Sequence, residues 1–129
     1  MVELSDKAKR LISEPNIAHL ATLMPDGSPH VTPVWIDLEG GRVVINTAEG
    51  RVKARNIRRD PRVALSIVSA SDPYDRVSVR GRVADIRDGD EATKHIDKLS
   101  AKYTGREIYA NHRPDEQRLI VEIEPESIY

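Results

Sequence analysis

The chain has 129 residues, with 20 Lys and Arg against 21 Asp and Glu, and it contains no cysteine. This length predicts a single domain over residues 1–129. The near-neutral charge argues against a nucleic-acid or membrane-surface partner, and the lack of cysteine excludes disulfides, thiolate nucleophiles and iron–sulfur clusters. No apolar run approaches the ~18 residues of a membrane span, and residues 1–10 lack a signal core, so we expect a cytoplasmic protein.

Aromatic residues make up only 4 % of the chain, with one Trp, four Tyr and no Phe. The core must therefore be built from Val, Ile, Leu and Ala. Two explanations are open: a bound cofactor or a subunit interface supplies the missing apolar bulk, or the core is simply aliphatic.

The first half of the chain predicts one short helix and three strands. Ser5 is a suitable N-cap for a helix over 5–14, which Pro15 ends. Apolar residues on both faces indicate a covered strand over 17–24, and the following sequence Pro25-Asp26-Gly27 favours a turn. Further strands are predicted over 29–38 and 42–47, joined by a short glycine-containing turn.

The second half predicts a two-turn helix from residue 51, strands over 61–69 and 77–83, a helix over 90–103 and a last strand over 119–123. In 77–83, valines alternate with Ser78 and arginines, which indicates one buried and one exposed face. Short connections favour antiparallel pairing. We therefore expect a mainly β domain: a small closed or half-open six-stranded barrel with short helices outside it.

Motifs of protein-only catalysis are missing from the sequence. It has no Gly-x-Gly-x-x-Gly, no phosphate-binding loop, no His-Glu-x-x-His and no nucleophile elbow. None of the four histidines stands at metal-ligand spacing from another. If the protein is an enzyme, a cofactor carries its chemistry.

The segment 51–62 breaks the neutral balance, because it holds six basic residues against Asp60 alone. A helix start attracts anions, so Arg51 and Lys53 in its first turn call for a negative partner. Helical spacing turns Lys53 toward the protein body. Two interpretations are open: Lys53 runs past Ile57 to solvent or a carboxylate, or it converges with Arg51, Thr47 and Asn56 on a phosphate or carboxylate.

The predicted second strand contains His30-Val31-Thr32-Pro33-Val34-Trp35. Pro33 lacks a ladder donor, so this strand lies at an edge or carries a bulge. Such a gap leaves backbone groups free to bond the polar edge of a planar ring. Trp35 would either stack on that ring or pack in the core.

In order and spacing, several segments resemble the pyridoxamine-phosphate-oxidase-like family of split-barrel flavin-binding proteins. The matching segments are His19-Leu20-Ala21-Thr22, Asp26-Gly27-Ser28-Pro29, Val43-Val44-Ile45-Asn46-Thr47, the run from Lys53 to Ala64, and the strand 77–83. The resemblance implies a six-stranded antiparallel split barrel and a homodimer with cofactors at the subunit interface.

The resemblance also implies roles for particular residues. The cofactor ring would lie against Thr32, Pro33, Val34 and Trp35, and its phosphate near Thr47, Arg51, Lys53 and Asn56. Tyr74 and Arg80 would reach the pocket from the partner subunit. No catalytic acid or base and no metal ligand is assigned.

Two differences from the vitamin B6 oxidases indicate which branch of this family the chain resembles. Those enzymes grip the phosphate of flavin mononucleotide (FMN) with adjacent Arg-Lys, whereas Val52 precedes Lys53 here, and this chain ends in Glu126-Ser127-Ile128-Tyr129 instead of a basic segment. The pattern Arg51-x-Lys53-x-x-Asn56 is similar to the actinobacterial enzymes that use the deazaflavin coenzyme F-420. That branch implies hydride transfer to a small unsaturated or conjugated-carbonyl substrate. An FMN flavoprotein and a non-catalytic carrier of flavin, haem or tetrapyrrole remain alternatives.

Overall fold

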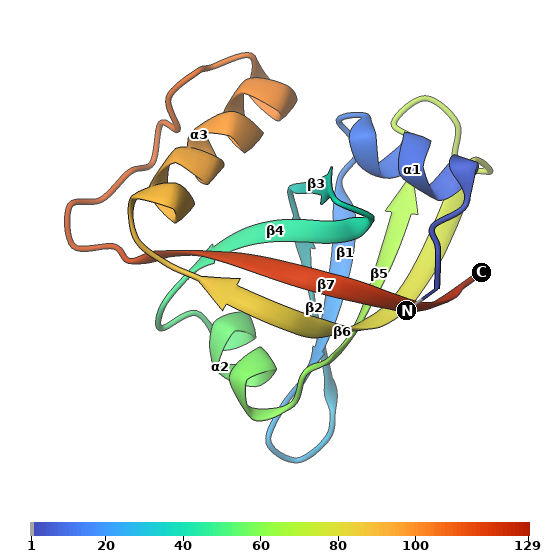
Figure 1. Ribbon diagram of the computed structural model, residues 1–129, viewed down its shortest axis with the longest axis horizontal. Coiled ribbons are helices and arrows are strands. Elements are labelled where there is room, and N and C mark those ends of the chain that lie inside the picture. Colours follow the sequence, from blue (N-terminus) through green and yellow to red (C-terminus); the bar gives the residue numbers. More distant parts are fainter. Residues whose placement is uncertain (1) are drawn as a thin grey trace.

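A computed structural model describes residues 2–129 as one curled antiparallel sheet with three helices against it (Figure 1). The elements in chain order are α1 (Asp6–Ser13), β1 (Ala18–Leu23), β2 (Pro29–Val34), β3 (Ile36–Glu39), β4 (Arg42–Ala48), α2 (Val52–Arg59), β5 (Arg62–Val68), β6 (Arg76–Arg87), α3 (Asp90–Thr104) and β7 (Arg118–Ile128). The predicted mainly β fold with short flanking helices is confirmed.

The strand count differs from the prediction, because seven strands form where six were expected. The predicted strand 29–38 is broken at Trp35 into β2 and β3. Helix α3 bonds both backbone groups of Ile36, the residue directly after the break: the Ile36 N–H donates to the Tyr103 hydroxyl at 3.1 Å, and the Ile36 carbonyl accepts from Lys102 Nζ at 2.7 Å. Strands β6 and β7 also run several residues further than predicted.

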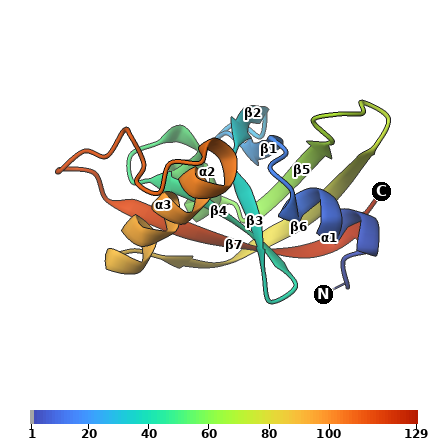
Figure 2. The same ribbon diagram turned by 90° about the horizontal axis from the view of Figure 1, so that it is seen from above.

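The order of the sheet is β2-β1-β5-β6-β7-β4-β3, so its two edge strands are consecutive in the chain. Only Trp35 separates them. An open sheet can connect its opposite edges through one residue only if it curls almost into a barrel, as Figure 2 shows from above. The barrel is split along the line where β2 and β3 meet without pairing, which we call the seam. The predicted edge position of the Pro33 strand is confirmed.

Local sequence signals explain the element boundaries. The Ser5 hydroxyl accepts the Ala8 N–H at 3.2 Å and caps α1. In the predicted turn after β1, Asp26 accepts the Ser28 N–H at 3.0 Å, and Gly27 has a φ of 86°, which favours glycine.

The main core is aliphatic and lies inside the curl, beneath α1 and α2. Its largest fully buried side chains include Leu11, Ile36, Ile45 and Ile67. A smaller cluster of Val44, Ala92 and Ile120 joins α3 to the outer face of β4 and β7. Among residues 2–129 the buried core contains no aromatic side chain, so low aromatic content is compatible with a well-packed interior.

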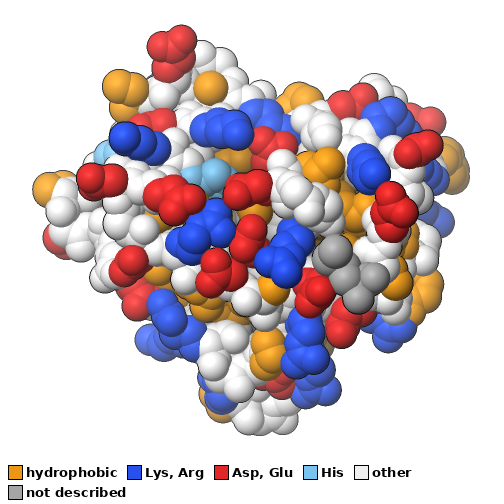
Figure 3. Space-filling model, in the orientation of Figure 1, with side chains coloured by type: hydrophobic (Ala, Val, Ile, Leu, Met, Phe, Trp, Pro, Cys, Tyr) orange, Lys and Arg blue, Asp and Glu red, His pale blue; other side chains and the backbone are white. Residues whose placement is uncertain are grey.

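Charged side chains of both signs are interspersed over the face in Figure 3. Arg87 at the end of β6 is the centre of one such group, with ion pairs to Glu39, Asp85, Glu91 and Glu122. No helix in residues 2–129 has both the length and the apolar character needed to cross a membrane.

Candidate functional site

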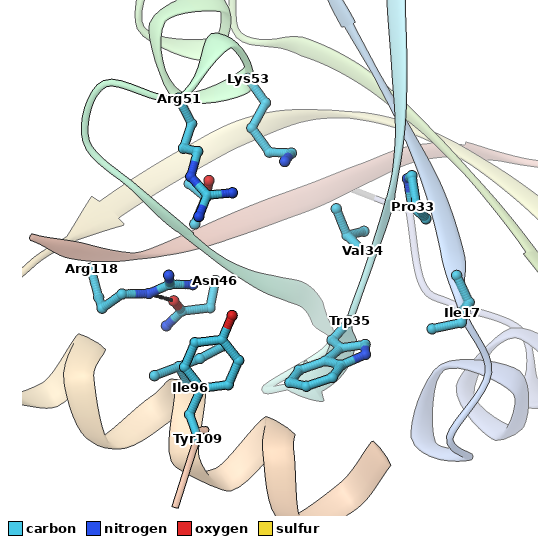
Figure 4. A pocket seen from close by; sticks show the side chains of 11 residues that line it. Ile17, Pro33, Val34, Trp35, Asn46, Arg51, Lys53, Ile96, Tyr109 and Arg118 are labelled. Atoms are coloured by element: carbon cyan, nitrogen blue, oxygen red, sulfur yellow. Dashed lines mark hydrogen bonds between the residues drawn. The ribbon is translucent and has the colours of Figure 1, made fainter. Parts of the chain in front are cut away.

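A cavity of about 320 Å³ opens at the seam (Figure 4). Its walls come from β2, β4, α2, α3, the first residue of β7, and the segments before β1 and β7. The lining residues are Ile17, Pro33, Val34, Trp35, Asn46, Thr47, Arg51, Lys53, Ile96, Tyr109 and Arg118.

The end of β4 forms one wall of this cavity. Strand β3 pairs with β4 only as far as Ile36 opposite Ile45, so residues 46–48 have β7 as a neighbour on one side and no strand on the other. A free strand edge offers backbone N–H and C=O groups to a ligand. Helix α2 packs against both β1 and β4, so it bridges the seam and brings its first turn to the cavity.

Aromatic side chains form the opposite wall. The Trp35 ring stacks on Tyr103, with centroids 5.4 Å apart and planes at 6°, and Tyr109 meets it edge-on at 5.9 Å. Trp35 therefore packs against Tyr103 and also lines the cavity, and its stacking on a cofactor ring stays a prediction. Tyr109 is held by Asp97, which accepts its N–H at 2.8 Å and also bonds His112.

The cavity is electropositive, since Arg51, Lys53 and Arg118 line it and no Asp or Glu among residues 2–129 does. Glu116 lies behind this wall, at 2.5 Å from Arg118 and 3.8 Å from Arg51. Lys53 is half-buried, as its helical position predicts, and its ammonium forms no hydrogen bond or ion pair with any other of residues 2–129. Burial lowers the pKa of Lys53, and the charges of Arg51 and Arg118 lower it further.

One buried hydroxyl in this site has no partner. Thr47 is 3 % exposed, and its Oγ1 makes no hydrogen bond within residues 2–129. Leaving such a group unbonded is costly, so its retention beside an unpaired ammonium suits a ligand that accepts or donates there.

Six of the ten predicted site residues line the cavity: Pro33, Val34, Trp35, Thr47, Arg51 and Lys53. Thr32 is on the same strand but outside the lining. Tyr74, in the β5–β6 loop, is 85 % exposed, and Arg80 lies against Tyr129, so neither contributes to the cavity of its own chain. Their predicted role from a partner subunit remains a prediction.

Asn56 does not lie where the sequence predicted, because its side chain points away from the cavity. It is buried, its amide donates to Thr22 Oγ1 at 3.0 Å, and its carbonyl accepts from Arg59 at 2.9 Å. Asn56 thus anchors α2 to β1. Two other basic residues of the segment 51–62, Arg58 and Arg62, pair with Glu49 and Asp60.

Sequence reasoning missed five lining residues: Ile17, Asn46, Ile96, Tyr109 and Arg118. Ile96 and Tyr109 reach the cavity only because α3 and the segment after it fold over the outer face of β4. Arg118 is 6 % exposed and had no local signal, since it stands at the start of an aliphatic strand. Asn46 directly precedes Thr47, and that adjacency was a usable signal.

A curled sheet that is split along a seam, with a positively charged cavity at that seam, defines the split-barrel class of fold. Over residues 4–129 the chain matches the family model of pyridoxamine 5'-phosphate oxidase, and it belongs to that family. This confirms the family inferred from the sequence segments.

The similar proteins include two with names that state an activity. The chain is 32 % identical to the F420H(2)-dependent biliverdin reductase of Mycobacterium tuberculosis (strain CDC 1551 / Oshkosh), over 97 % of this chain and 86 % of that protein. The solved structure of an F420 reductase is 29 % identical, with a TM-score of 0.82 and 98 % of both chains covered. A conserved hypothetical protein of M. tuberculosis is 27 % identical, with a TM-score of 0.71 over 98 % of this chain and 84 % of that one.

Proposed function

We propose that this protein is an oxidoreductase that uses coenzyme F-420 and transfers a hydride between the reduced deazaflavin and a small unsaturated or conjugated-carbonyl substrate. The observation that carries the proposal is the unpaired, half-buried Lys53 beside the unbonded Thr47 hydroxyl, in a cavity with an aromatic wall. The similarity to two F420-dependent proteins favours the deazaflavin over FMN.

The residues present fit such a cofactor. A phosphodiester would bind at the start of α2, where Lys53 and Arg51 add charge to the unpaired N–H groups of a helix start. The edge of a planar ring would meet the free end of β4, and its face would lie near Val34 and Trp35. The exposed arginines further along α2 would attract the acidic tail that this coenzyme carries.

When bound, the reduced deazaflavin supplies the hydride. The protein orients the two reactants, excludes water with Ile17, Val34 and Ile96, and neutralises the ligand's negative charge. No side chain in the cavity is assigned as a proton donor. The relative named for biliverdin makes that conjugated tetrapyrrole the first substrate to test.

We also propose a homodimer in which Tyr74 and Arg80 of each subunit approach the cavity of the other. The support is the family resemblance and the exposure of Tyr74 and Val31, which are large apolar side chains. Sedimentation velocity tests this: a dimer supports the proposal, and a monomer at micromolar concentration contradicts it.

Fluorescence titration with coenzyme F-420, run beside FMN, tests the cofactor. We expect tighter binding of F-420, and we expect Lys53→Ala to weaken it by about 1.5–3 kcal/mol, the value of a charge-assisted hydrogen bond. Arg58→Ala is the matched control, because it removes one cation from the same helix at a side chain that pairs with Glu49. Preference for FMN would move the protein to the flavoprotein alternative, and equal effects of both variants would remove Lys53 from the site.

Turnover separates an enzyme from a carrier. Reduced F-420 is incubated with the protein and biliverdin, or with small conjugated carbonyl compounds, and its oxidation is followed by absorbance. Protein-dependent oxidation supports the oxidoreductase, whereas tight binding without oxidation across the whole substrate set supports the carrier.

A further inference from the structure

Arg118 is a buried cation on the wall of the seam cavity. It stands at the first position of β7, is 6 % exposed, and its guanidinium lies over the Tyr109 ring at 5.5 Å from the centroid (Figure 4). Burying a guanidinium is costly unless its N–H groups have acceptors. The hydrogen-bond acceptors around the Arg118 guanidinium therefore indicate its role.

Two of the three guanidinium nitrogens of Arg118 are bonded. Nε donates to Asn46 Oδ1 at 2.7 Å, and Nη1 donates to Glu116 Oε1 at 2.5 Å. Nη2 has no hydrogen-bond partner within residues 2–129. Glu116 also forms an ion pair with Arg51, so two arginines share one carboxylate. Lys53 has no carboxylate partner within residues 2–129. This wall of the cavity therefore carries a net positive charge, and Arg118 Nη2 is available as a hydrogen-bond donor.

Asn46 is held in one orientation by its neighbours on α3. Its Nδ2 donates to the Ala92 carbonyl at 2.9 Å and lies 3.0 Å from His95 Nδ1. Burial, followed by the charge of Lys98, lowers the pKa of His95 to about 4, so its ring is neutral and Nδ1 can accept. Because the amide nitrogen faces α3, the amide oxygen must face Arg118.

We propose that Arg118 contacts the ligand of the seam cavity, donating from Nη2 to an anionic or carbonyl oxygen, and that Asn46 and His95 are positioning residues that fix its guanidinium on the cavity wall. This contact is separate from the Lys53 end of the cavity and gives the site a second point of recognition. It rests on the proposed function only for the identity of the ligand. Nη2 is the one guanidinium nitrogen that residues 2–129 leave unbonded, and Arg118 lines the cavity, so Nη2 is the donor available to a ligand there.

A double-mutant cycle tests the proposal with F-420 and FMN as probes. Arg118→Lys keeps the charge, but its single nitrogen cannot reach Asn46, Glu116 and the ligand from three separate positions, so we expect it to weaken binding about tenfold or more, as for a lost bond to a charged group. We expect His95→Leu, which removes one of the two acceptors of the Asn46 amide and leaves the Ala92 carbonyl, to weaken binding by a smaller factor, and His95→Gln, which keeps an acceptor, to restore it.

The decisive comparison uses Arg118→Gln as the background. If His95 acts through Arg118, His95→Leu has no further effect on binding there. An equal effect in both backgrounds would show that His95 only supports the fold and would overturn the positioning role. Thermal unfolding of every variant confirms that folded proteins are being compared.

A ligand-free measurement separates this inference from the proposed function. The Arg118 Nε–H is bonded and buried, so its NMR signal should exchange slowly with water in the wild type and in His95→Gln, and faster in His95→Leu. Unchanged exchange overturns the positioning network.

Tight binding of FMN in place of F-420 overturns the proposed cofactor and leaves Arg118 testable with FMN. Binding of neither probe overturns the ligand contact as well.

Discussion

The hydroxyl of Thr47 is the clearest sign, at the scale of one residue, that the seam cavity is built for a ligand. Valine has nearly the same shape and no polar group, and it would remove an unbonded buried hydroxyl. Removing such a group is neutral or stabilising. A buried polar residue that lowers the free energy of unfolding relative to an apolar residue of the same shape is typical of functional sites. Thr47 meets this description and lines the cavity.

We therefore expect Thr47→Val to raise the free energy of unfolding by up to about 1 kcal/mol while weakening cofactor binding. Urea unfolding and the fluorescence titration measure the two effects on the same preparation. A variant that loses stability would mean that the hydroxyl is bonded in the folded protein, and one that binds as well as the wild type would remove Thr47 from the site.

His95 predicts a specific pH dependence of stability. The pKa of its ring is lowered from 6.5 to about 4 by burial, so between these values the unfolded chain binds a proton that the folded chain does not. Stability is therefore fully present above pH 6.5 and falls as the pH drops toward 4, by about 2–3 kcal/mol from this residue. We expect His95→Gln to lose less stability than the wild type between pH 7 and pH 5 in urea unfolding. Parallel curves for the two proteins would contradict the neutral, buried ring.

At the scale of elements, helix α3 is bonded to the backbone directly beside the point where the strand 29–38 is interrupted. The Tyr103 hydroxyl donates to the Asn16 carbonyl at 2.7 Å and accepts the Ile36 N–H at 3.1 Å, so one side chain ties α3 to the start of β1 and to the break at Trp35. The Lys102 ammonium adds bonds to the carbonyls of Ile12 and Ile36, both at 2.7 Å.

Replacing Tyr103 by Phe keeps the stack on Trp35 and removes these two bonds. We expect a loss of about 1–3 kcal/mol in the free energy of unfolding, because a buried N–H and a carbonyl lose their partner. We also expect faster amide exchange at Ile36. Tyr109→Phe is the control, since the Tyr109 hydroxyl has no hydrogen bond within residues 2–129. Equal stabilities of the two variants would show that the break is maintained by packing alone.

The interruption of the strand at Trp35 also shows which parts of the fold can be predicted from the sequence. Periodicity, caps and turns predicted every helix and all the strand regions, because each depends on residues close together in the chain. Nothing near Trp35 indicates that residues 102 and 103, far along the chain, will bond the backbone of Ile36. The same limit applies to the site. Lys53 and Thr47 carry local signals, whereas Arg118 and Tyr109 reach the cavity through tertiary packing. For Asn56, helical spacing alone cannot distinguish a residue that anchors α2 from one that binds a ligand.

For the whole molecule, the curl of the sheet creates the seam, and the seam creates the cavity. Within the curled sheet, the pairing of β6 with β7 shifts register between Arg80 and Gly81. A Cβ at Gly81 would overlap the backbone oxygen of Glu124 and lie 3.2 Å from Pro125 Cα. Both obstacles are main chain of the neighbouring strand, so they cannot move aside as a flexible side chain would.

We therefore expect Gly81→Ala to destabilise the protein by about 3 kcal/mol or more, a loss that only a few mechanisms produce. Ser78→Ala, an exposed position on the same strand without a side-chain hydrogen bond, is the matched control and should stay within about 0.5 kcal/mol of the wild type. Urea unfolding measures both variants. If Gly81→Ala proves as stable as the control, the two strands can separate at this point without loss, and the curl that joins β2 to β3 through Trp35 must be maintained by the packing of α1 and α3 against the sheet.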